Sequence, residues 1–414
     1  LPDLPIQYRD FTHWQRSVLD DERLEEQLAY WRDHLDQSPI LTTFPPDFTR
    51  PPHQSYRGAV EHFEIEGALV DRLRRIGKEQ NSTLFATLLA AFTVLVSKYS
   101  RQQDVVIGTP VANRPREELE GLIGFFANTL PLRLDFPTTS TFSQLVEQTR
   151  ETLRGAFENQ DLPFEQMVGE IRPDRDPSHS PLCQTLLVLR KEPLRHLVVE
   201  DLEVDPIDTG RITAKFDTTL ELEETPTGLK GYWEYATDLY QPETVRRMIG
   251  HFKVLLPALA DRPGDPIRTI PITTETERHC LVESWNRTAT DYPDEATIHS
   301  LFEAQTRATP NAVATVAQLT EWTYKQLDEA AEAVADTLQD HDIRADDLVG
   351  VYAHRSHHLI AGLIGILESG GAYVPLDPEY PAERLRFMIE DTGTRVILVT
   401  ADLLQRLREL IEDT

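Results

Sequence analysis

Cysteine is scarce in this sequence of 414 residues. There are only two, Cys183 and Cys280, and they lie far apart. This excludes a disulfide framework and a zinc site built from paired cysteines. A reducing compartment, the cytoplasm, is therefore the expected location.

Long apolar runs are absent as well. The longest candidate, residues 84–96, is interrupted by Thr87 and Thr93. It falls short of the roughly 20 residues that span a bilayer, so it predicts a buried helix rather than a membrane anchor. The first residues, LPDLP, contain neither a basic region nor an apolar core, and residue 1 is not Met. We therefore expect no signal peptide and a chain that begins inside a longer protein.

Basic residues are few. The 41 Lys and Arg face 69 Asp and Glu, which gives a net charge of −28, and only seven of the basic residues are Lys. This charge argues against nucleic acid or an anionic membrane as a partner, because both need a basic surface. An acidic, Lys-poor chain is compatible with a salt-adapted surface, but an ordinary solvated surface explains it more simply. A hydrophobic fraction of 40% is typical of globular proteins, and the length suggests two or three domains.

General catalytic motifs are also missing. The sequence has no GxxxxGK[ST] phosphate loop, no GxGxxG, no GxSxG and no paired CxxC. His354, His357 and His358 form a cluster that could be a metal site or contain a catalytic base. No carboxylate stands at metal-motif spacing, so we favour the alternative, a solvated turn that opens a helix.

Hydrophobic periodicity predicts mixed α/β structure up to about residue 260. Ser82 is the expected N-cap of one helix, and the strand at 216–223 alternates as if half-exposed and should pair with the strand at 229–235. The expected helices are 22–37, 82–99, 141–159 and 242–259, and the expected strands are 104–109, 184–190, 197–207, 216–223 and 229–235.

Prolines and glycine between 261 and 274 predict a linker. Beyond residue 296, helices alternate with short apolar strands, the pattern of a parallel sheet with crossover helices. The expected helices are 298–308, 324–339, 358–368 and 382–391, and the expected strands are 348–353, 372–375 and 395–399.

Three segments of the first region combine residues that suggest a site. The segment 121–129, GLIGFFANT, suggests close backbone packing with an amide facing a channel. Taken alone, 159–165 (NQDLPFE) is a helix exit, and 175–182 (RDPSHSPL) is a polar loop. Arg175 could form an ion pair in that loop with Asp176 or with Asp161.

Together these segments resemble the condensation domain of nonribosomal peptide synthetases. Residues 8–14 are similar to the family's YxDYAxW, 107–114 to (V/I)GTPVANR, 123–129 to IGxFVNT, 159–165 to (H/N)QDxPFE and 175–182 to RDxSRxPL. Ala127 and His179 depart from these patterns. Residues 322–327 and 367–377 resemble the first two motifs of an adenylation domain, (L)TYxEL and LKAGGAYVPLD, with Glu368 and Ser369 replacing Lys and Ala.

The resemblance implies an α/β fold, a chloramphenicol-acetyltransferase-like condensation lobe with a mixed sheet plus helices, followed by a partial adenylate-forming α/β domain. It divides the chain into 1–55, connecting helices from a missing N-terminal condensation lobe; 56–260, the C-terminal lobe; 261–295, a linker; and 296–414, the N-terminal part of an adenylation domain. Two such lobes enclose a tunnel in this family, and a lone lobe should expose an apolar face and tend to associate.

The site residues follow from the same resemblance. Expected tunnel or motif positions are Gly124, Asn128, Gln160, Asp161, Arg175 and Ser178, and expected structural positions of the adenylation motifs are Tyr324, Gly370, Gly371, Tyr373 and Asp377. Asn128 is expected either to contact substrate or to brace the fold. No catalytic residue and no metal ligand is expected, because HHxxxDG and TSGTTGxPKG do not occur in the sequence.

The family's cofactors and partners are implied too. We expect no cofactor bound by this chain itself, with phosphopantetheine on carrier domains and Mg-ATP serving the complete protein. The expected partners are peptidyl or aminoacyl carrier domains, the missing condensation lobe and the rest of the adenylation domain. Two alternatives stay open: a non-catalytic remnant that docks carrier proteins, and another acyltransferase or an epimerization domain of the same fold.

Overall fold

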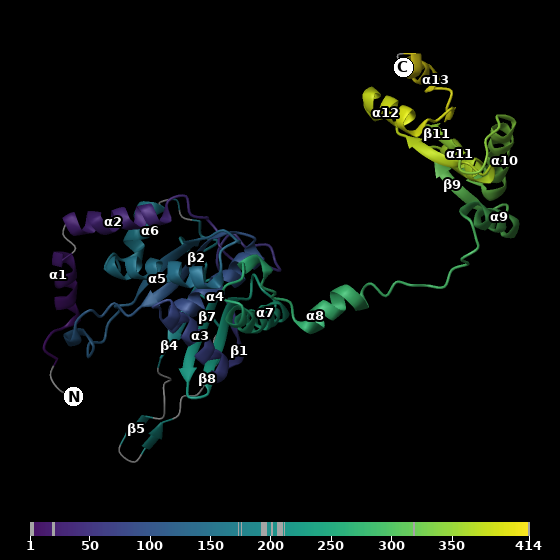
Figure 1. Cartoon of the computed structure of the whole chain (residues 1–414). Helices are drawn as coiled ribbons and strands as arrows, with labels where there is room; N and C mark the ends of the chain where they lie inside the picture. The colour runs from purple at the N-terminus through teal and green to yellow at the C-terminus, as the bar shows by residue number, and fades with distance from the viewer. Residues whose placement is uncertain are drawn as a thin grey trace. The chain divides into compact units, whose positions relative to one another are not determined.

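The computed structural model describes residues 4–18, 21–172, 174, 176–191, 197–199, 202–204, 210, 212–317 and 319–412. The chain divides into two compact units, Leu1–Arg287 and Thr288–Thr414 (Figure 1).

A mixed six-stranded sheet organises the first unit. Its strand order is β1-β8-β7-β4-β2-β3. The pairs β1–β8, β7–β8 and β2–β3 are antiparallel, whereas β4 runs parallel to both β7 and β2. The strands are β1 (Gly58–Glu66), β2 (Asp104–Val111), β3 (Asn128–Asp135), β4 (Thr185–Arg190), β7 (Thr218–Thr225) and β8 (Gly228–Ala236). The sheet confirms the expected mixed architecture and the pairing of 216–223 with 229–235.

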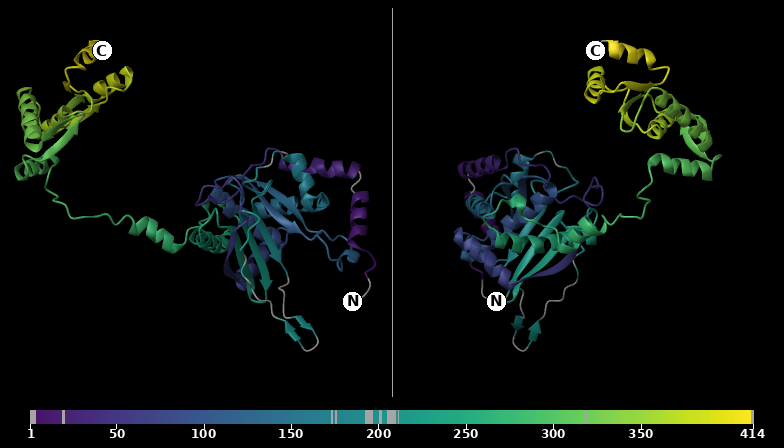
Figure 2. Two further views of the ribbon diagram at one scale, coloured as in Figure 1. Left: turned by 180° about the vertical axis from the view of Figure 1, so that it is seen from behind. Right: turned by 45° about the vertical axis from the view of Figure 1, so that its right-hand side comes forward.

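Helices α3 (Gly67–Glu79), α4 (Leu84–Ser100), α5 (Phe142–Glu158) and α7 (Pro242–Asp261) pack around this sheet (Figure 2). The rings of Phe92 on α4 and Phe252 on α7 both meet Trp233 of β8, so these two helices cover the same face of the sheet. All three side chains are fully buried. Burying an aromatic side chain of this size stabilises a fold by about 1.5–3 kcal/mol, which makes this contact a principal part of the core.

Two local predictions are wrong. The N-cap of α4 is Thr83 rather than Ser82, and its Oγ1 accepts the amide of Ala86 at 3.2 Å. The strand β7 is not half-exposed, because it lies between β4 and β8 and its first five residues, Thr218 to Leu222, are all buried. Polar residues on its second face are covered; Glu221, for example, pairs with Arg190 at 3.0 Å.

The N-terminal helices α1 (Tyr8–Val18) and α2 (Asp21–Leu35) contact different parts of the first unit. In α1, Phe11 shares a small apolar cluster with residues of the loop 112–127, which contains a 3-10 turn at Glu117–Leu119. In the same loop the side chains of Ile123 and Phe125 are 96% and 77% exposed. The short helix α6 (Phe164–Ile171) lies against α2.

The strand expected at 197–207 is a short antiparallel hairpin, β5 (Leu197–Val199) with β6 (Leu202–Val204). The remaining residues of that prediction lie outside the described ones.

Most of the expected linker, 261–295, belongs to the first unit, which ends at Arg287. Ile267 and Ile270 are each 2% exposed and belong to the main core. The helix α8 (Glu275–His279), followed by a π-helical turn at Cys280–Ser284, is held to α7 by Glu277, whose carboxylate lies 2.9 Å from Nε2 of His251. The boundary between the two units falls at 287/288.

The second unit contains the predicted parallel sheet, in the order β12-β11-β13, and a separate hairpin of β9 and β10. All four helices and three strands expected here are present. The strands are β9 (Val313–Ala317), β10 (Thr320–Thr323), β11 (Leu348–Tyr352), β12 (Ala372–Leu376) and β13 (Val396–Val399). The helices are α9 (Ile298–Ala308), α10 (Tyr324–Asp340), α11 (His357–Glu368), α12 (Ala382–Thr392) and α13 (Leu404–Glu412).

Over the described ranges, no single helix is long and apolar enough to cross a membrane. One bent pair, α3 with α4, meets the length and composition criteria together. Thirteen residues of α4 are buried inside the first unit, as the sequence predicts for 84–96.

Candidate functional site

The side chain of Asn128, the first residue of β3, holds the turn at 159–164. Its Nδ2 donates to the carbonyl oxygens of Gln160 and Leu162 at 2.9 and 2.8 Å, and its Oδ1 accepts the amides of Phe164 and Thr129, both at 3.0 Å. Asn128 is 8% exposed. Both donors and both acceptor positions of the amide are therefore occupied within the chain, and the geometry supports the bracing role rather than substrate contact.

Helix α2 holds the same turn from another side. Arg23 pairs with Asp161 at 2.7 Å, Gln27 Oε1 accepts the amide of Leu162 at 2.8 Å, and the indole of Trp31 donates to the carbonyl of Asn159 at 2.9 Å. Sequence reasoning missed Arg23 and Gln27. The signal that could have found them is their spacing, because residues 23, 27 and 31 are four apart and share one helix face.

Asp161 therefore pairs with Arg23. The ion pairs expected for Arg175, with Asp176 or Asp161, cannot be assigned, since Arg175 lies outside the described residues.

A cavity of about 750 Å³ opens beside this turn. The segment 109–114 forms one part of its wall, Gln160 another, and the end of β4 a third. Gln160 also anchors itself by donating from Nε2 to the carbonyl of Phe157 at 2.9 Å. The side chain of Phe157, in the last turn of α5, is 42% exposed and lines the cavity.

Gly124 does not line this cavity; it makes a close contact instead. A Cβ atom on Gly124 would lie 2.3 Å from the ring of Tyr8, so only glycine lets that ring pack against the loop. The hydroxyl of Tyr8 then donates to the carbonyl of Phe125 at 2.8 Å. The glycine expected at a tunnel position thus attaches α1 to the loop.

The loop that contains Ser178 is fixed by a buried ion pair. Arg50 donates from Nη1 to Oδ1 of Asp217 at 2.9 Å and to the carbonyl of Ser178 at 3.2 Å. Asp217 is 1% exposed. The amide of Ser178 donates to Asp176 at 2.8 Å, and hydrogen bonds from Ser178 hold the pKa of Asp176 below its usual range.

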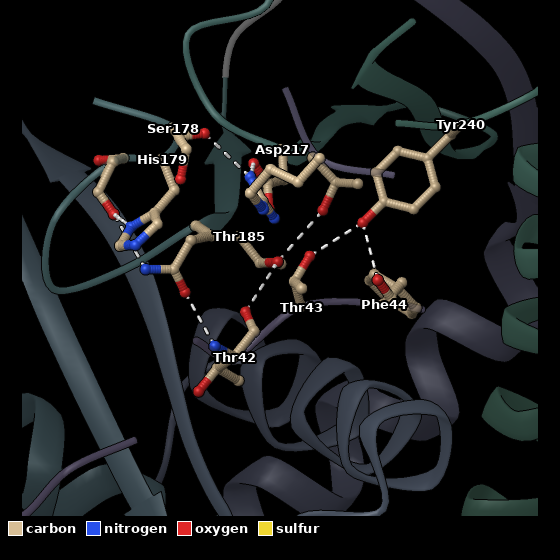
Figure 3. A network of polar contacts seen from close by, with 12 residues as sticks. Thr42, Thr43, Phe44, Ser178, His179, Thr185, Asp217 and Tyr240 are labelled. Carbon is tan, nitrogen blue, oxygen red and sulfur yellow. Dashed lines mark hydrogen bonds and ion pairs between the residues drawn. The ribbon is translucent and has the colours of Figure 1, made fainter. Parts of the chain in front are cut away.

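Figure 3 shows this region together with the neighbouring segment 42–44. There the hydroxyl of Tyr240 lies 2.9 Å from both Thr43 Oγ1 and the carbonyl of Phe44. Arg50 links Asp217 to the carbonyl of Ser178, so we assign this ion pair to holding the Ser178 loop. Removing one partner of a buried, hydrogen-bonded ion pair costs about 3–5 kcal/mol.

In the second unit, the expected motif positions make local structural contacts. Tyr324 is the first residue of α10, behind a capping box formed by Thr323 and Gln326. Gly370 has φ +88°, which favours glycine, and the amide of Gly371 donates to the carbonyl of Ile366 at 3.0 Å. Tyr373 lies on β12, 41% exposed, and Asp377 follows β12, where its Oδ1 accepts the amide of Glu379 at 2.9 Å.

The histidine cluster is neither a metal site nor simply a solvated turn. His357 is 5% exposed, and its ring nitrogens lie 2.7 Å from Thr315 Oγ1 and 3.0 Å from Thr320 Oγ1. The ring stacks on Trp322 with the centroids 4.8 Å apart. The expected solvated turn that opens a helix is right for His354 and His358, which are exposed beside the Ser356 cap of α11, but wrong for His357, which joins this helix to the β9–β10 hairpin.

Over the described ranges no metal centre is found, and the buried cysteine Cys183 is a poor candidate for a nucleophile. These ranges contain no group of three or more His, Cys, Asp or Glu side chains that could hold a metal ion. Burial raises the pKa of the Cys183 thiol to about 12, so this cysteine is unsuited to act as a nucleophile.

Known families match both units of the chain. The Condensation domain model matches residues 1–282, and the AMP-binding enzyme model matches residues 302–414. The chain belongs to the condensation-domain family.

Curated relatives match both parts at once. Gramicidin S synthase 2 of Brevibacillus brevis is 38% identical over 404 residues, which cover 98% of this chain and 9% of the relative. Surfactin synthase subunit 1 of Bacillus subtilis (strain 168) is 35% identical over 96% of this chain and 11% of the relative. The chain thus spans a small fraction of these relatives, and it is a segment of a nonribosomal peptide synthetase, a condensation domain followed by the start of an adenylation domain.

Solved structures agree with this assignment. Holo-AB3403, a four-domain nonribosomal peptide synthetase bound to AMP and glycine, matches with a TM-score of 0.78 and 27% identity over 96% of this chain and 32% of that one. The X-domain from teicoplanin biosynthesis, in complex with OxyB, matches with a TM-score of 0.62 and 26% identity over 66% of this chain and 62% of that one.

Proposed function

We propose that the first unit forms one wall of the reaction tunnel of a condensation domain. The cavity is the observation that carries this proposal. Two family motifs line it, at 109–114 and at Gln160, and Asn128 of a third motif holds the turn that places Gln160 there. These motifs are far apart in the sequence. Motifs that served only as local turns would not be expected to meet at one cavity.

In the complete synthetase, this tunnel would join two substrates carried on phosphopantetheine arms. The acceptor amine attacks the carbonyl carbon of the donor thioester, the C–N bond forms, the C–S bond breaks, and the proton lost by nitrogen ends on the departing thiolate. The described residues contribute shape and positioning to this reaction. The sequence has no HHxxxDG motif, so the group that would manage the proton is not among its residues.

We assign the second unit to the early part of a domain that activates an amino acid with Mg-ATP. In that reaction the amino-acid carboxylate attacks the α-phosphorus of ATP and pyrophosphate leaves. The family's phosphate loop does not occur in the sequence, so the described unit supplies β-sheet framework rather than the ATP contacts. Carrier domains with their phosphopantetheine arms would be the partners of both units.

One experiment uses the cavity wall. In the complete synthetase, Gln160→Leu should slow amide formation at least about tenfold while leaving ATP–pyrophosphate exchange unchanged. Gln148→Leu is the matched control, since Gln148 also donates from Nε2 to a backbone carbonyl, that of Asp135 at 2.8 Å, but does not line the cavity. Equal condensation rates for parent and Gln160→Leu would contradict the tunnel-wall role.

The chain of residues 1–414 provides a second test. It should form no amide from an aminoacyl-carrier donor and acceptor, and it should show no ATP–pyrophosphate exchange with any proteinogenic amino acid. Turnover above the protein-free background in either assay would show that the reacting groups have been wrongly placed outside these residues.

A second candidate function is a docking platform without condensation activity. It is favoured by one observation: the X-domain, a structural neighbour, was solved in complex with OxyB. A complete synthetase whose parent form makes no amide at this domain, while carrier binding to the first unit persists, would favour this alternative.

A further inference from the structure

The turn that contains Gln160 has no regular secondary structure of its own. It covers residues 159–163, between the end of α5 and the start of α6. Side chains from two other elements, β3 and α2, hold it in place. These side chains are Asn128 of β3 and Arg23, Gln27 and Trp31 of α2. The position of Gln160 in the cavity wall therefore depends on residues outside the turn.

The side chain of Gln160 has one group left to offer to the cavity. Its Nε2 donates to the carbonyl of Phe157 at 2.9 Å, and the described residues supply no partner for its Oε1. Because Gln160 lines the cavity, this oxygen is a single hydrogen-bond acceptor whose use depends on where the backbone places it. A displacement of about 1 Å in such a group can slow a reaction by up to about 100-fold.

Both neighbours of Gln160 in the turn are tied to α2. The indole of Trp31 donates to the carbonyl of Asn159 at 2.9 Å, and Arg23 pairs with Asp161 at 2.7 Å. The two contacts differ in burial. Trp31 is fully buried in the main core, whereas the side chains of Arg23 and Asp161 are 48% and 25% exposed. An exposed ion pair contributes little to folding stability, so the effect of this one is local: it fixes one side of Gln160.

We propose that Arg23 is a positioning residue for amide formation, which holds Asp161 and thereby places Gln160 in the cavity wall. Arg23 does not line the cavity itself, so it acts through the turn rather than by contact with a substrate. This role of Arg23 rests on the proposed tunnel-wall role of Gln160. It adds a residue of α2 that lies outside all the sequence motifs described above.

Rates measured in the complete synthetase test this role. Arg23→Met and Asp161→Asn each remove the ion pair. Each should lower the single-turnover rate of amide formation by about three- to fivefold, because an exposed ion pair rarely contributes more than a factor of about five. ATP–pyrophosphate exchange should be unchanged in both variants. Arg23→Lys retains the cation and should stay within about twofold of the parent. An unchanged rate of amide formation in Arg23→Met and Asp161→Asn would overturn the positioning role.

The matched control is Arg32→Met. Arg32 lies on the same helix, its side chain is 45% exposed, and its ion-pair partners, Glu25 and Glu170, lie outside the turn. This variant should leave the rate of amide formation within about 1.5-fold of the parent. A loss as large as that of Arg23→Met would show that any loosening of α2 slows the reaction, and would overturn the specific role of Arg23.

A double-mutant cycle tests whether Arg23 acts through Gln160. In a Gln160→Leu background, Arg23→Met should cause no further loss of rate, because the side chain that it positions is already gone. A residue that merely stabilised the first unit would slow the reaction equally in both backgrounds. The same fold-loss in the parent and in the Gln160→Leu background would therefore contradict the proposal.

Hydrogen exchange reports the turn without any reaction. The amide of Leu162 donates to Gln27, one residue beyond Asp161. Its exchange should be faster in Arg23→Met than in Arg32→Met. Equal exchange in the two variants would show that Arg23 does not hold the turn.

Failure of the proposed function has a different signature. If Gln160→Leu slows amide formation but Arg23→Met and Asp161→Asn do not, the tunnel-wall role stands and the positioning role is wrong. If Gln160→Leu leaves amide formation unchanged, the tunnel-wall role is wrong, and any slowing by Arg23→Met comes from another contact.

Discussion

Removing the amide of Asn128 should release the turn that the site depends on. In Asn128→Ala, the carbonyl groups of Gln160 and Leu162 and the amide of Phe164 lose their partner on β3. Asn128→Asp is the sharper variant, because it retains an oxygen to accept the Phe164 amide but places a carboxylate against two carbonyl oxygens.

The expected loss of stability follows from these contacts. Three hydrogen bonds join β3 to the turn, and each contributes about 1 kcal/mol net. A buried group left unpaired costs about 1–3 kcal/mol, and water that enters the space offsets part of this. We therefore expect Asn128→Ala to lower the free energy of unfolding by about 3 kcal/mol, and Asn128→Asp by at least as much at neutral pH.

Urea unfolding of the 1–414 chain, followed by tryptophan fluorescence, measures this loss. Trp31 is a built-in reporter, since its indole donates to Asn159 in the same turn. Hydrogen exchange at the Phe164 amide reports the turn directly. Asn159→Ala is the control, because that side chain makes one hydrogen bond, to Gly155 within α5, and should cost about 1 kcal/mol. An Asn128→Ala variant within about 0.5 kcal/mol of the parent, with unchanged exchange at Phe164, would refute the bracing role.

Two further predictions concern pH. Burial, and then the charge of Arg133, lower the pKa of His34 from 6.5 to about 4, and its neutral Nε2 accepts the Arg133 amide at 3.1 Å. The stabilisation from this contact should be complete above pH 6.5 and should be lost, by about 3 kcal/mol, as the pH falls towards 4. His34→Gln should therefore flatten the dependence of the free energy of unfolding on pH in this range, and an unchanged acid slope would count against the role of His34. Burial, and then Asp328, Glu303 and Glu332, raise the pKa of Glu368 from 4.5 to about 7, so its ionised form opposes folding. After allowance for its exposure, Glu368→Gln should stabilise the second unit by about 1 kcal/mol at pH 8 and hardly at all at pH 4.5, and equal thermal shifts at both pH values would contradict this.

Short-range patterns predicted most elements of the fold. The helix expected at 242–259 is α7, Pro242–Asp261, and the alternation beyond residue 296 is the parallel sheet of the second unit. Such predictions succeed because helices, caps and turns depend on hydrogen bonds between residues a few positions apart. The strand β7 shows the limit. Its polar alternation suggested an exposed face, but whether that face is covered depends on β4, β8 and their side chains, which the period of one strand does not reveal.

The candidate site divides in the same way. The sequence by itself determined that 159–165 leaves a helix in a turn, that Asn128 lies in a segment with tight glycine packing, and that these motifs belong with a condensation domain. Only the tertiary structure decided that Asn128 holds that turn, that Arg23 and Gln27 of α2 hold it too, and that Gln160 and the segment 109–114 line one cavity. These contacts join residues 32 to 138 positions apart, and no local pattern encodes them, because they form only when the common core brings α2, α3, β3 and β4 together.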